Sequence, residues 1–437
     1  MKMKLLSAAV AALLSAPAFA DALPEGPMAF EGLTSSKTTP SDQWDIPAGY
    51  SQRIVSDESR LDIYAGDDWN DMNTVNEDKD DEKTGRYLYR THEVRPDAAN
   101  LAGYEGGAVS VVDLKNGKAT VLVQRYDWEA LDGIVWTPWN TILMAEETGG
   151  ALLKDPEVPQ AKHGLLYEIS LRNHTKAKSV DVRPLLGSLA HEGIELDGDG
   201  NVYVIDEYSA GGIYKFVPEV YGDLSSGDLY ALVLDSATPD RTGPAEWVKL
   251  DRDAVQVSAR EAGAAVGGVT YGRPEDLERI GNTLYVAMTS ENRVMAITLG
   301  GKPMVTTFVD GGTPNFVADK DFETAEATFE KVDNLASGPD GRLWIVEDNI
   351  PSDIWVADPD SDLDGASDKV RLFASFNDGS AEGTGIYFGN DPHTLFVNVQ
   401  HSADDNDRTV AISRDLDDED HHHGKHDRHD KDDKRHH

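Results

Sequence analysis

The chain has 437 residues, and its 79 acidic and 40 basic side chains give a formal net charge of −39. Such an acidic balance argues against nucleic acid and anionic membrane surfaces as partners and favours cations as ligands. The sequence contains no cysteine, which excludes disulfides, thiolate metal ligands and a cysteine nucleophile.

Residues 1–20 have the pattern of a secretory signal peptide. Two lysines precede an apolar run over residues 5–14, and Ala18-Phe19-Ala20 forms a small-x-small cleavage site. The apolar run is too short to cross a bilayer, and no later apolar run is as long. We therefore predict a periplasmic or secreted protein without membrane insertion, whose mature chain begins near Asp21.

Composition also marks the ends of the folded region. Residues 21–60 carry Pro, Ser and Thr, and we expect them to run over the surface. Residues 404–437 are dominated by Asp, His and Lys, cannot form a packed core and are predicted to be a disordered tail. The tail is suited to weak binding of zinc, copper or nickel, and a purely solvated tail is the alternative. Residues 61–403 between them are predicted to form one folded domain.

One sequence pattern recurs through the middle of the chain. In its clearest copy, DNLASGPDGRLWIVEDN (333–349), an acidic residue opens an apolar stretch, a glycine-containing turn follows, and a second apolar run ends on carboxylates. Fourteen positions separate the opening and closing acids of three copies, which are Asp132 and Glu146, Glu192 and Asp206, and Asp333 and Glu347. Looser copies run over residues 275–291, 382–401 and 71–93.

Each copy predicts a hairpin of two short strands, because β-branched and aromatic residues flank a turn built on Gly, Asp or Asn. Repeats at a spacing of roughly 50–80 residues are typical of a β-propeller, whose blades cannot bury their faces alone. We therefore predict an all-β fold, a β-propeller with the recurrent acids at one mouth of its central channel. The alternative is that these acids are solvated turn residues. Helical patterns are limited to residues 253–264 and 323–332.

Two acidic segments carry weaker signals. The Asp- and Asn-rich stretch at 67–81 is typical of a solvated loop. Asp360-x-Asp362-x-Asp364-Gly365 matches the first half of an EF-hand calcium loop, but Arg371 stands at the twelfth position, where that loop needs a bidentate glutamate. A surface calcium loop and a solvated loop are both compatible with this second stretch.

The ends of the repeats carry residues suited to holding a metal. Carboxylates that converge on one mouth repel each other, by about 4 kcal/mol for two charges about 4 Å apart at an effective dielectric near 20. Protonation or bound cations must relieve this repulsion. Oxygen ligands in an exported protein favour calcium, and an occasional histidine also suits iron, manganese or zinc. The candidate metal ligands are Glu146, Glu147, Glu192, Asp206, Glu207, Glu275, Asp333, Asn334, Glu347, Asp348 and Glu382.

Longer stretches around these residues resemble the PhoX-type alkaline phosphatase family of exported six-bladed β-propellers. The matching stretches are DGIVWTPWNTILMAEE, LAHEGIELDGDGNVYVIDE with GGIYKFVP, YGRPEDLE, DNLASGPDGRLWIVEDN and EGTGIYFGNDPHTLFVNVQH. In addition, RTHEV is similar to the family's Asn-His-Glu segment. The resemblance extends over residues 67–401 and implies six blades.

The resemblance implies a mixed calcium and iron (Fe³⁺) centre at one mouth of the channel, which hydrolyses phosphate monoesters. It assigns the phosphate clamp to Arg273. It implies metal ligands at Glu146, Glu192, Glu275, Asp333 and Glu347. The family has a cysteine, an iron ligand, before the paired glutamates, whereas this chain has Ala145. The iron site therefore lacks its thiolate, and the carboxylate calcium sites remain.

Pro274, the residue after Arg273, restricts the backbone conformation of Arg273. Pro274 disfavours a helical backbone in the residue before it, so we predict that Arg273 is extended and faces the same side as Glu275, two positions on. A guanidinium can then grip two phosphate oxygens at once, which a lysine cannot. The alternative is that Arg273 only pairs with neighbouring acids and relieves their repulsion.

Three functions are compatible with the sequence. The first is a metal-dependent phosphoesterase that acts on a small phosphorylated substrate, and it is the one we favour. The second is a non-catalytic calcium-binding propeller that serves as a surface or matrix protein. The third is a calcium-dependent propeller hydrolase of another kind, such as a lactonase. Calcium together with a transition metal would support the enzyme, and calcium alone would support the binding protein.

Overall fold

The computed structural model describes residues 26–30, 33, 43–61, 69–96, 101, 104–316, 329–376 and 379–416. The predicted signal peptide, most of the predicted tail and most of the predicted helix at 323–332 lie outside these residues. The other predicted helix is confirmed as α1 (Arg252–Ala265), and Asp251 caps it by accepting hydrogen bonds from the N–H groups of Asp253 and Ala254. No described helix is both long and apolar enough to cross a membrane.

Most described strands belong to six antiparallel meanders, numbered here in chain order. Meander 1 contains β3 (Trp69–Val75), β4 (Tyr87–Glu93), β5 (Ala108–Asp113) and β6 (Lys118–Gln124). Meander 2 contains β7 (Leu131–Trp136), β8 (Thr141–Glu146), β9 (Leu166–Asn173) and β10 (Lys176–Val182). Meander 3 contains β11 (Ile194–Leu196), β12 (Val202–Ile205), β13 (Gly211–Val220) and β14 (Asp223–Leu234).

The second half of the chain repeats this arrangement. Meander 4 contains β17 (Pro274–Ile280), β18 (Thr283–Met288), β19 (Arg293–Thr298) and β20 (Met304–Asp310). Meander 5 contains β22 (Val332–Ser337), β23 (Leu343–Glu347), β24 (Asp353–Ala357) and β25 (Val370–Phe376). Meander 6 contains β26 (Glu382–Phe388), β27 (Thr394–Gln400), β28 (Arg408–Arg414) and β2 (Tyr50–Asp57).

A few short elements connect or extend these sheets. β15 (Gly243–Lys249) pairs with both β14 and β20 and so joins meanders 3 and 4. β16 (Thr270–Tyr271) pairs with β13, and both β1 (Trp44–Asp45) and β21 (Asn315–Phe316) pair with β25. Short 3-10 helices cover Glu58–Arg60, Pro184–Leu186 and Thr289–Glu291.

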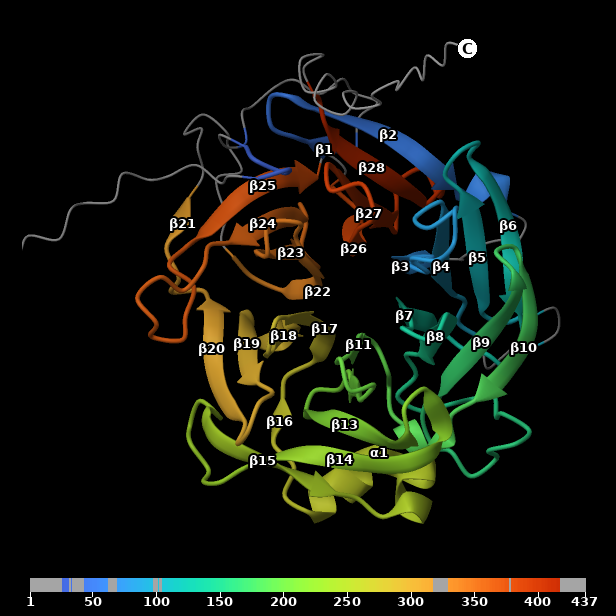
Figure 1. Cartoon of the computed structure of the whole chain (residues 1–437), viewed down its shortest axis with the longest axis vertical. Helices are drawn as coiled ribbons and strands as arrows, with labels where there is room; N and C mark the ends of the chain where they lie inside the picture. The colour runs from blue at the N-terminus through green and yellow to red at the C-terminus, as the bar shows by residue number, and fades with distance from the viewer. Residues whose placement is uncertain are drawn as a thin grey trace, which may run out of the picture.

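The six meanders are arranged radially around a central opening (Figure 1). The first strand of each meander lies nearest to the opening, and these strands are β3, β7, β11, β17, β22 and β26. Each of them contacts the next one along the chain, and β26 contacts β3. The innermost strands therefore form a closed ring.

Segments from the two ends of the chain complete meander 6. β2 pairs with β28 in antiparallel register, from Tyr50 opposite Arg414 to Asp57 opposite Arg408. The sequence predicted a surface segment at 21–60 and a folded domain at 61–403, and both strands lie outside those domain limits. A pairing between opposite ends of a chain leaves no local pattern, so the repeat alone does not reveal it.

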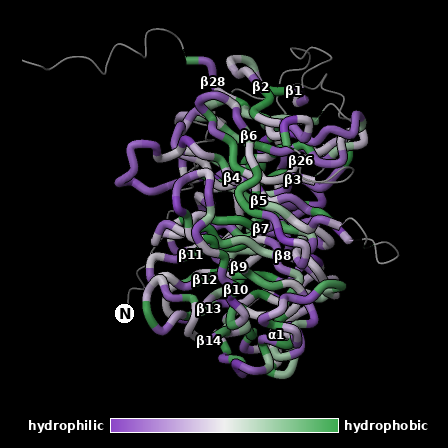
Figure 2. Tube along the Cα trace, turned by 90° about the vertical axis from the view of Figure 1, so that its right-hand side faces the viewer, coloured by the Kyte–Doolittle hydropathy of each residue, from purple (hydrophilic) through white to green (hydrophobic). Residues whose placement is uncertain are grey.

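Apolar side chains fill the interfaces between neighbouring meanders. Between meanders 5 and 6, Trp344 and Phe373 stack edge to face with ring centroids 4.8 Å apart and pack with Leu395 and Val410. Further clusters fill the other five interfaces. In the side view, hydrophobic residues follow the strands and hydrophilic residues follow many connecting loops (Figure 2). Each meander therefore buries its faces against its two neighbours.

β3 corrects one prediction. The stretch at 67–81 was expected to be a solvated loop, but Trp69–Val75 is a strand and Asp71 in it is only 6% exposed. The residues that follow β3 are the ones that form turns. The polar side chains of β3 conceal the strand pattern because part of the strand faces the central opening instead of an apolar interface.

Candidate metal centre

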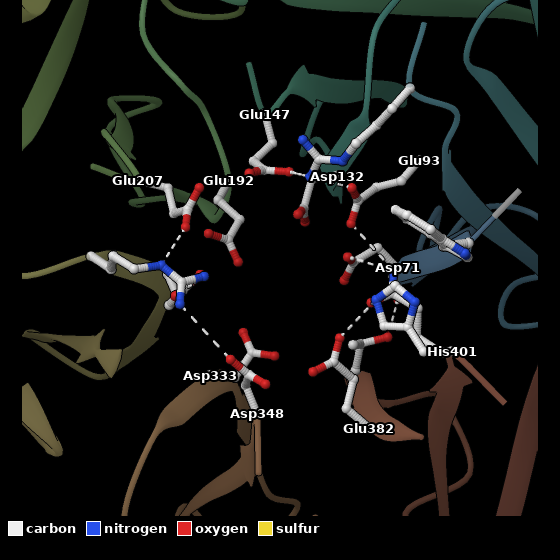
Figure 3. Close-up of a pocket in the computed structure, with 16 residues that line it drawn as sticks. Asp71, Glu93, Asp132, Glu147, Glu192, Glu207, Asp333, Asp348, Glu382 and His401 are labelled. Atoms are coloured by element: carbon white, nitrogen blue, oxygen red, sulfur yellow. Dashed lines mark hydrogen bonds and ion pairs between the residues drawn. The ribbon is translucent and has the colours of Figure 1, made fainter. Parts of the chain in front are cut away.

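An acidic cavity of about 200 Å³ lies within the central opening (Figure 3). Its lining includes Arg95, Arg273 and His401 as basic residues. Ten of the sixteen lining residues are carboxylates, namely Asp71, Glu93, Asp132, Glu147, Glu192, Glu207, Glu275, Asp333, Asp348 and Glu382. They approach the cavity from several sides, as the labelled side chains in Figure 3 show.

The repeat explains where these acids come from. Every meander supplies one carboxylate from its innermost strand or from the residues just before it, and these are Asp71, Asp132, Glu192, Glu275, Asp333 and Glu382. Four meanders supply another at or just beyond the end of the second strand, and these are Glu93, Glu147, Glu207 and Asp348. The radial arrangement of the meanders therefore brings acids that are far apart in the sequence into one cluster.

Irregular strand pairing helps to direct the first set of acids. In four innermost strands the pairing register with the second strand of the meander shifts at the acid. The acid lies between two residues that pair regularly with that second strand. The flanking residues are Asn70 and Asn73, Leu131 and Ile134, Pro274 and Leu277, and Val332 and Leu335. Such irregularities bend a strand and change the direction in which a side chain points.

Two groups of three carboxylates in this pocket are compact enough to hold an ion. Within each group, one ligand oxygen per residue lies within 4.8 Å of the others, and all the side chains are buried. The groups are Asp71, Glu93 and Asp132, and Glu192, Glu275 and Asp333. Among the described residues, Oδ1 of Asp132 and Oε2 of Glu192 have no hydrogen-bond partner. Because a buried acceptor without a partner is costly, these oxygens fit a cation.

Burial changes the protonation of the pocket. It raises the pKa of Glu275 to about 7, and together with the nearby Glu382 it raises the pKa of Asp348 to about 8. Burial and neighbouring carboxylates also raise the pKa of Asp132, Glu192 and Asp333 well above the usual range. The metal-free pocket therefore keeps protons near neutral pH, and a cation must displace them to bind.

Arg273 lies among these acids, although its backbone differs from the prediction. Its φ is 48°, in the left-handed region, whereas Pro274 led us to expect an extended residue. The N–H of Arg273 donates to Tyr208 O at 2.9 Å, and its carbonyl accepts from Thr289 N at 3.0 Å. These bonds hold the unusual backbone, and Nη2 of Arg273 still lies 2.9 Å from Oε1 of Glu275.

The carboxylate partners of Arg273 come from two further meanders. Its Nε donates to Oε1 of Glu207 at 2.7 Å, and its Nη1 lies 3.8 Å from Oδ2 of Asp348. The side chain of Arg273 is nevertheless 41% exposed, compared with 12% for Glu207. Each of the three guanidinium nitrogens of Arg273 therefore lies near a carboxylate, and the side chain is still partly exposed.

Two other basic residues occupy the rim. Arg95 pairs with Glu93 and Glu147, and Nε2 of His401 lies 3.2 Å from Oε1 of Glu382. The hydrogen bond to Glu382 raises the pKa of His401. Although burial acts in the opposite direction, the bonds from His401 and Asp348 lower the pKa of Glu382.

Four predicted ligands are not among the residues that line the pocket. Three of them, Glu146, Asp206 and Glu347, close the second hairpin strand of a repeat. Each accepts a hydrogen bond from the backbone ahead of the innermost strand of its own meander, at 3.1 Å from Glu129 N, 3.1 Å from Ala190 N and 2.8 Å from Glu330 N, respectively. The residue after each of them, Glu147, Glu207 or Asp348, lines the pocket.

The fourth of these residues supports a pocket acid instead of lining the pocket. Nδ2 of Asn334 donates to Oδ1 of Asp333 at 3.0 Å, and Oδ1 of Asn334 accepts from Gly385 N at 2.5 Å. The amide therefore links Asp333 to meander 6. The remaining predicted residues, Glu147, Glu192, Glu207, Arg273, Glu275, Asp333, Asp348 and Glu382, all line the pocket.

Sequence reasoning missed part of the pocket. Asp132 opens a clear copy of the repeat, and Asp71 and Glu93 bound the weakest copy, yet the sequence did not mark them as ligands. Their positions in the repeat are the signal that could have identified them. No comparable signal marks Trp69 or Arg95, because neither position recurs in the other copies.

Ala145, where the resemblance places a cysteine, lies in an apolar environment. It is fully buried in the cluster between meanders 2 and 3, with Leu143, Leu166 and Leu189. It is not one of the pocket-lining residues, and the sequence has no cysteine to supply a thiolate elsewhere. The residues present fit calcium through their carboxylates but do not provide the thiolate of the implied iron site.

Comparison with known proteins places these observations in a family. A family model described as alkaline phosphatase PhoX matches residues 135–403. Among solved structures, Pseudomonas fluorescens PhoX in complex with vanadate, a transition state analogue, matches with a TM-score of 0.64 and 18% identity over 89% of this chain and 98% of that chain. This likeness shows a shared fold.

More distant structures also match. A gluconolactonase from Xanthomonas campestris gives a TM-score of 0.44 and 13% identity over 86% of this chain and 98% of that chain. The search of curated proteins found no match. Because the family model spans more than half of the chain, the protein belongs to the PhoX alkaline phosphatase family of phosphoester hydrolases.

Proposed function

We propose that this protein is an exported, calcium-dependent phosphomonoesterase whose active site is the acidic pocket. One observation carries the proposal. Buried carboxylate groups with unpaired oxygens share a pocket with Arg273, whose guanidinium is partly exposed. A cavity with both cation ligands and a cationic side chain suits a phosphate monoester, because its phosphoryl oxygens can contact a bound metal and the guanidinium at the same time.

We also infer that the six meanders are the blades of a six-bladed β-propeller. Three observations support this inference: the radial arrangement, the closed ring of innermost strands, and the meander completed by β2 and β28. A ring closed by strands from both ends of the chain would fix the positions of all six inner carboxylates. This rigidity matters because an ion needs its ligands in place before it binds.

Calcium is the metal that the donor set supports. Calcium takes six to eight oxygen ligands and tolerates irregular geometry. Two groups of three carboxylates, with Thr384 and Gln400 also in the lining, supply hard oxygen donors. Iron (Fe³⁺) would need a different ligand set from the one the resemblance implies, because Ala145 replaces the cysteine.

The pocket's own residues would divide the work of the reaction. When bound, calcium would offset the negative charge of the acids and polarise the phosphoryl group. Arg273 would orient the phosphate by donating two parallel hydrogen bonds to its oxygens. The ion pairs with Glu207, Glu275 and Asp348 would fix the position of the guanidinium.

A second candidate function rests on the residue at 145. Without the thiolate of the implied iron site, the pocket could bind calcium and not catalyse, as a surface or matrix protein would. This alternative retains the calcium response and lacks phosphatase turnover. Export to the periplasm or beyond the cell is part of both proposals and rests on the signal-peptide pattern of residues 1–20.

Metal content and activity can be measured on one preparation. The purified mature protein is stripped with a chelator, reloaded with calcium and analysed for calcium and iron. It is then assayed with p-nitrophenyl phosphate and with bis-p-nitrophenyl phosphate. We expect stoichiometric calcium and a monoesterase activity that the chelator removes and calcium restores. Calcium uptake without turnover would support the binding protein, and no calcium uptake would overturn both proposals.

A further inference from the structure

Trp69 differs in chemistry from the rest of the pocket lining. Among the sixteen lining residues, it is the one with a large apolar side chain, and ten of the others are carboxylates. It begins β3 and pairs in register with Glu93, so it lies next to one of the two carboxylate groups.

Packing among the described residues does not account for this tryptophan. Within that part of the chain, Trp69 belongs to none of the apolar clusters that fill the interfaces between meanders, and its side chain is only partly buried. An indole beside an acidic cavity leaves apolar surface in contact with water, which costs free energy unless a ligand covers it.

The indole is held in place by His401. The two ring centroids are 4.4 Å apart with an interplanar angle of 65°, an edge-to-face arrangement. His401 is itself fixed, because Glu382 binds its Nε2 at 3.2 Å and its backbone N–H donates to Oδ2 of Asp407 at 3.0 Å. Its φ of 60° is in the left-handed region, which is uncommon for a residue with a side chain.

Trp69 and Arg273 belong to different parts of the pocket wall. Arg273 is bound by Glu207, which Figure 3 shows on the left, whereas His401 and Glu382 lie on the right. The cavity would therefore separate a phosphate bound by Arg273 from the wall formed by His401 and Trp69. A substituent on that phosphate that crosses the cavity meets this wall.

The geometry points to Trp69 as a specificity residue that stacks on a planar aromatic leaving group. This inference rests on the proposed phosphomonoesterase function and names its preferred substrate class, aryl and arylalkyl phosphate monoesters. Stacking of aromatic rings adds to the gain from simple burial, so it favours an aromatic group over a saturated group of similar polarity.

Benzyl phosphate and ethyl phosphate test this inference on the calcium-loaded protein. We expect Trp69→Ala to lower kcat/KM for benzyl phosphate by about three- to tenfold and to change that for ethyl phosphate by less than about twofold. Trp69→Phe should retain most of the preference. Equal losses on both substrates, or no loss on benzyl phosphate, would overturn the inference.

Two controls keep the result interpretable. Tyr126 is 66% exposed and is not among the lining residues, so Tyr126→Ala should leave the preference intact. If Trp69→Ala does not fold, Trp69→Leu replaces it, because leucine keeps apolar bulk without a planar face. This variant should also lose the preference for benzyl phosphate, and an intact preference would count against stacking.

A binding measurement separates this inference from the proposed function. If the wild type hydrolyses neither substrate, the phosphomonoesterase proposal fails, and calorimetry with benzylphosphonate and ethylphosphonate then tests the subsite alone. Tighter binding of benzylphosphonate that Trp69→Ala abolishes would support stacking. Equal binding of the two phosphonates by the wild type would overturn it.

Discussion

Glu146 and Glu147 are consecutive residues, but only Glu147 lines the acidic pocket. The carboxylate of Glu146 accepts hydrogen bonds from Glu129 N and Leu165 N, both at 3.1 Å. The carboxylate of Glu147 pairs with Arg95 at the pocket rim. Glu146 therefore joins two loops of meander 2, whereas Glu147 contributes charge to the candidate metal centre.

This difference predicts opposite phenotypes for two matched variants. Glu147→Gln should weaken calcium binding by about tenfold or more, equivalent to about 1.4 kcal/mol, because it removes a pocket charge. Glu146→Gln should bind calcium like the wild type but lower the free energy of unfolding by about 1–3 kcal/mol, because the amide cannot accept both backbone bonds as well. Calorimetry and chemical denaturation measure the two effects. An equal loss of calcium affinity in both variants would contradict the assignment.

Arg273→Lys should separate substrate binding from folding. Lysine keeps the charge but loses the planar fork, so we expect kcat/KM to fall by about tenfold or more, or about 1.4 kcal/mol, while calcium still raises the melting temperature. Arg252→Lys is the control, since Arg252 has a similar exposed fraction, 43%, and pairs with surface acids. A lower melting temperature with unchanged turnover per folded molecule would show that Arg273 is structural.

Asp206→Asn should destabilise the fold without affecting the metal. Asp206 is fully buried and binds Arg260 through two bonds of 2.5 and 2.6 Å, and Arg260 lies 3.9 Å above the ring of Tyr208. Removing one partner of a buried ion pair typically costs about 3–5 kcal/mol. We therefore expect a clear loss in denaturation experiments with wild-type calcium stoichiometry. A change in that stoichiometry would return Asp206 to the list of metal ligands.

The metal-free protein should lose stability as the pH rises. Burial raises the pKa of Glu146 to about 8, that of Glu275 to about 7 and that of Asp348 to about 8, the last with help from Glu382. In the unfolded chain such groups titrate near pH 4–4.5. The folded state therefore binds more protons between these values, so its free energy of unfolding falls from about pH 5 to about pH 8.

Chemical denaturation at several pH values, with a chelator and with saturating calcium, measures this dependence. Calcium should flatten the curve, because it replaces the protons as the partner of the carboxylates. The acids whose pKa is lowered by ion pairs, such as Asp228, titrate below this window and do not interfere. A metal-free protein whose stability is constant or rises from pH 5 to pH 8 would contradict the prediction.

The sequence by itself determined the repeat and much of its chemistry. The spacing of fourteen between opening and closing acids marked both strands of a hairpin, and meanders 2, 3 and 5 contain those hairpins. The resemblance to the phosphatase family also pointed to Arg273 and Glu275, which both line the pocket. The hairpin predictions depend on local features, the turn residues and the alternation of side chains, which a short stretch of chain contains in full.

Only the tertiary structure decided which acid of each pair reaches the pocket. Glu146 and Glu147 look equivalent in the sequence, and the choice between them depends on where the strand ends and on which backbone N–H groups of a neighbouring loop need an acceptor. The wall formed by Trp69 and His401 joins meanders 1 and 6, which lie at opposite ends of the chain. Contacts of this kind arise when the ring closes, because closure brings together residues that share no local pattern.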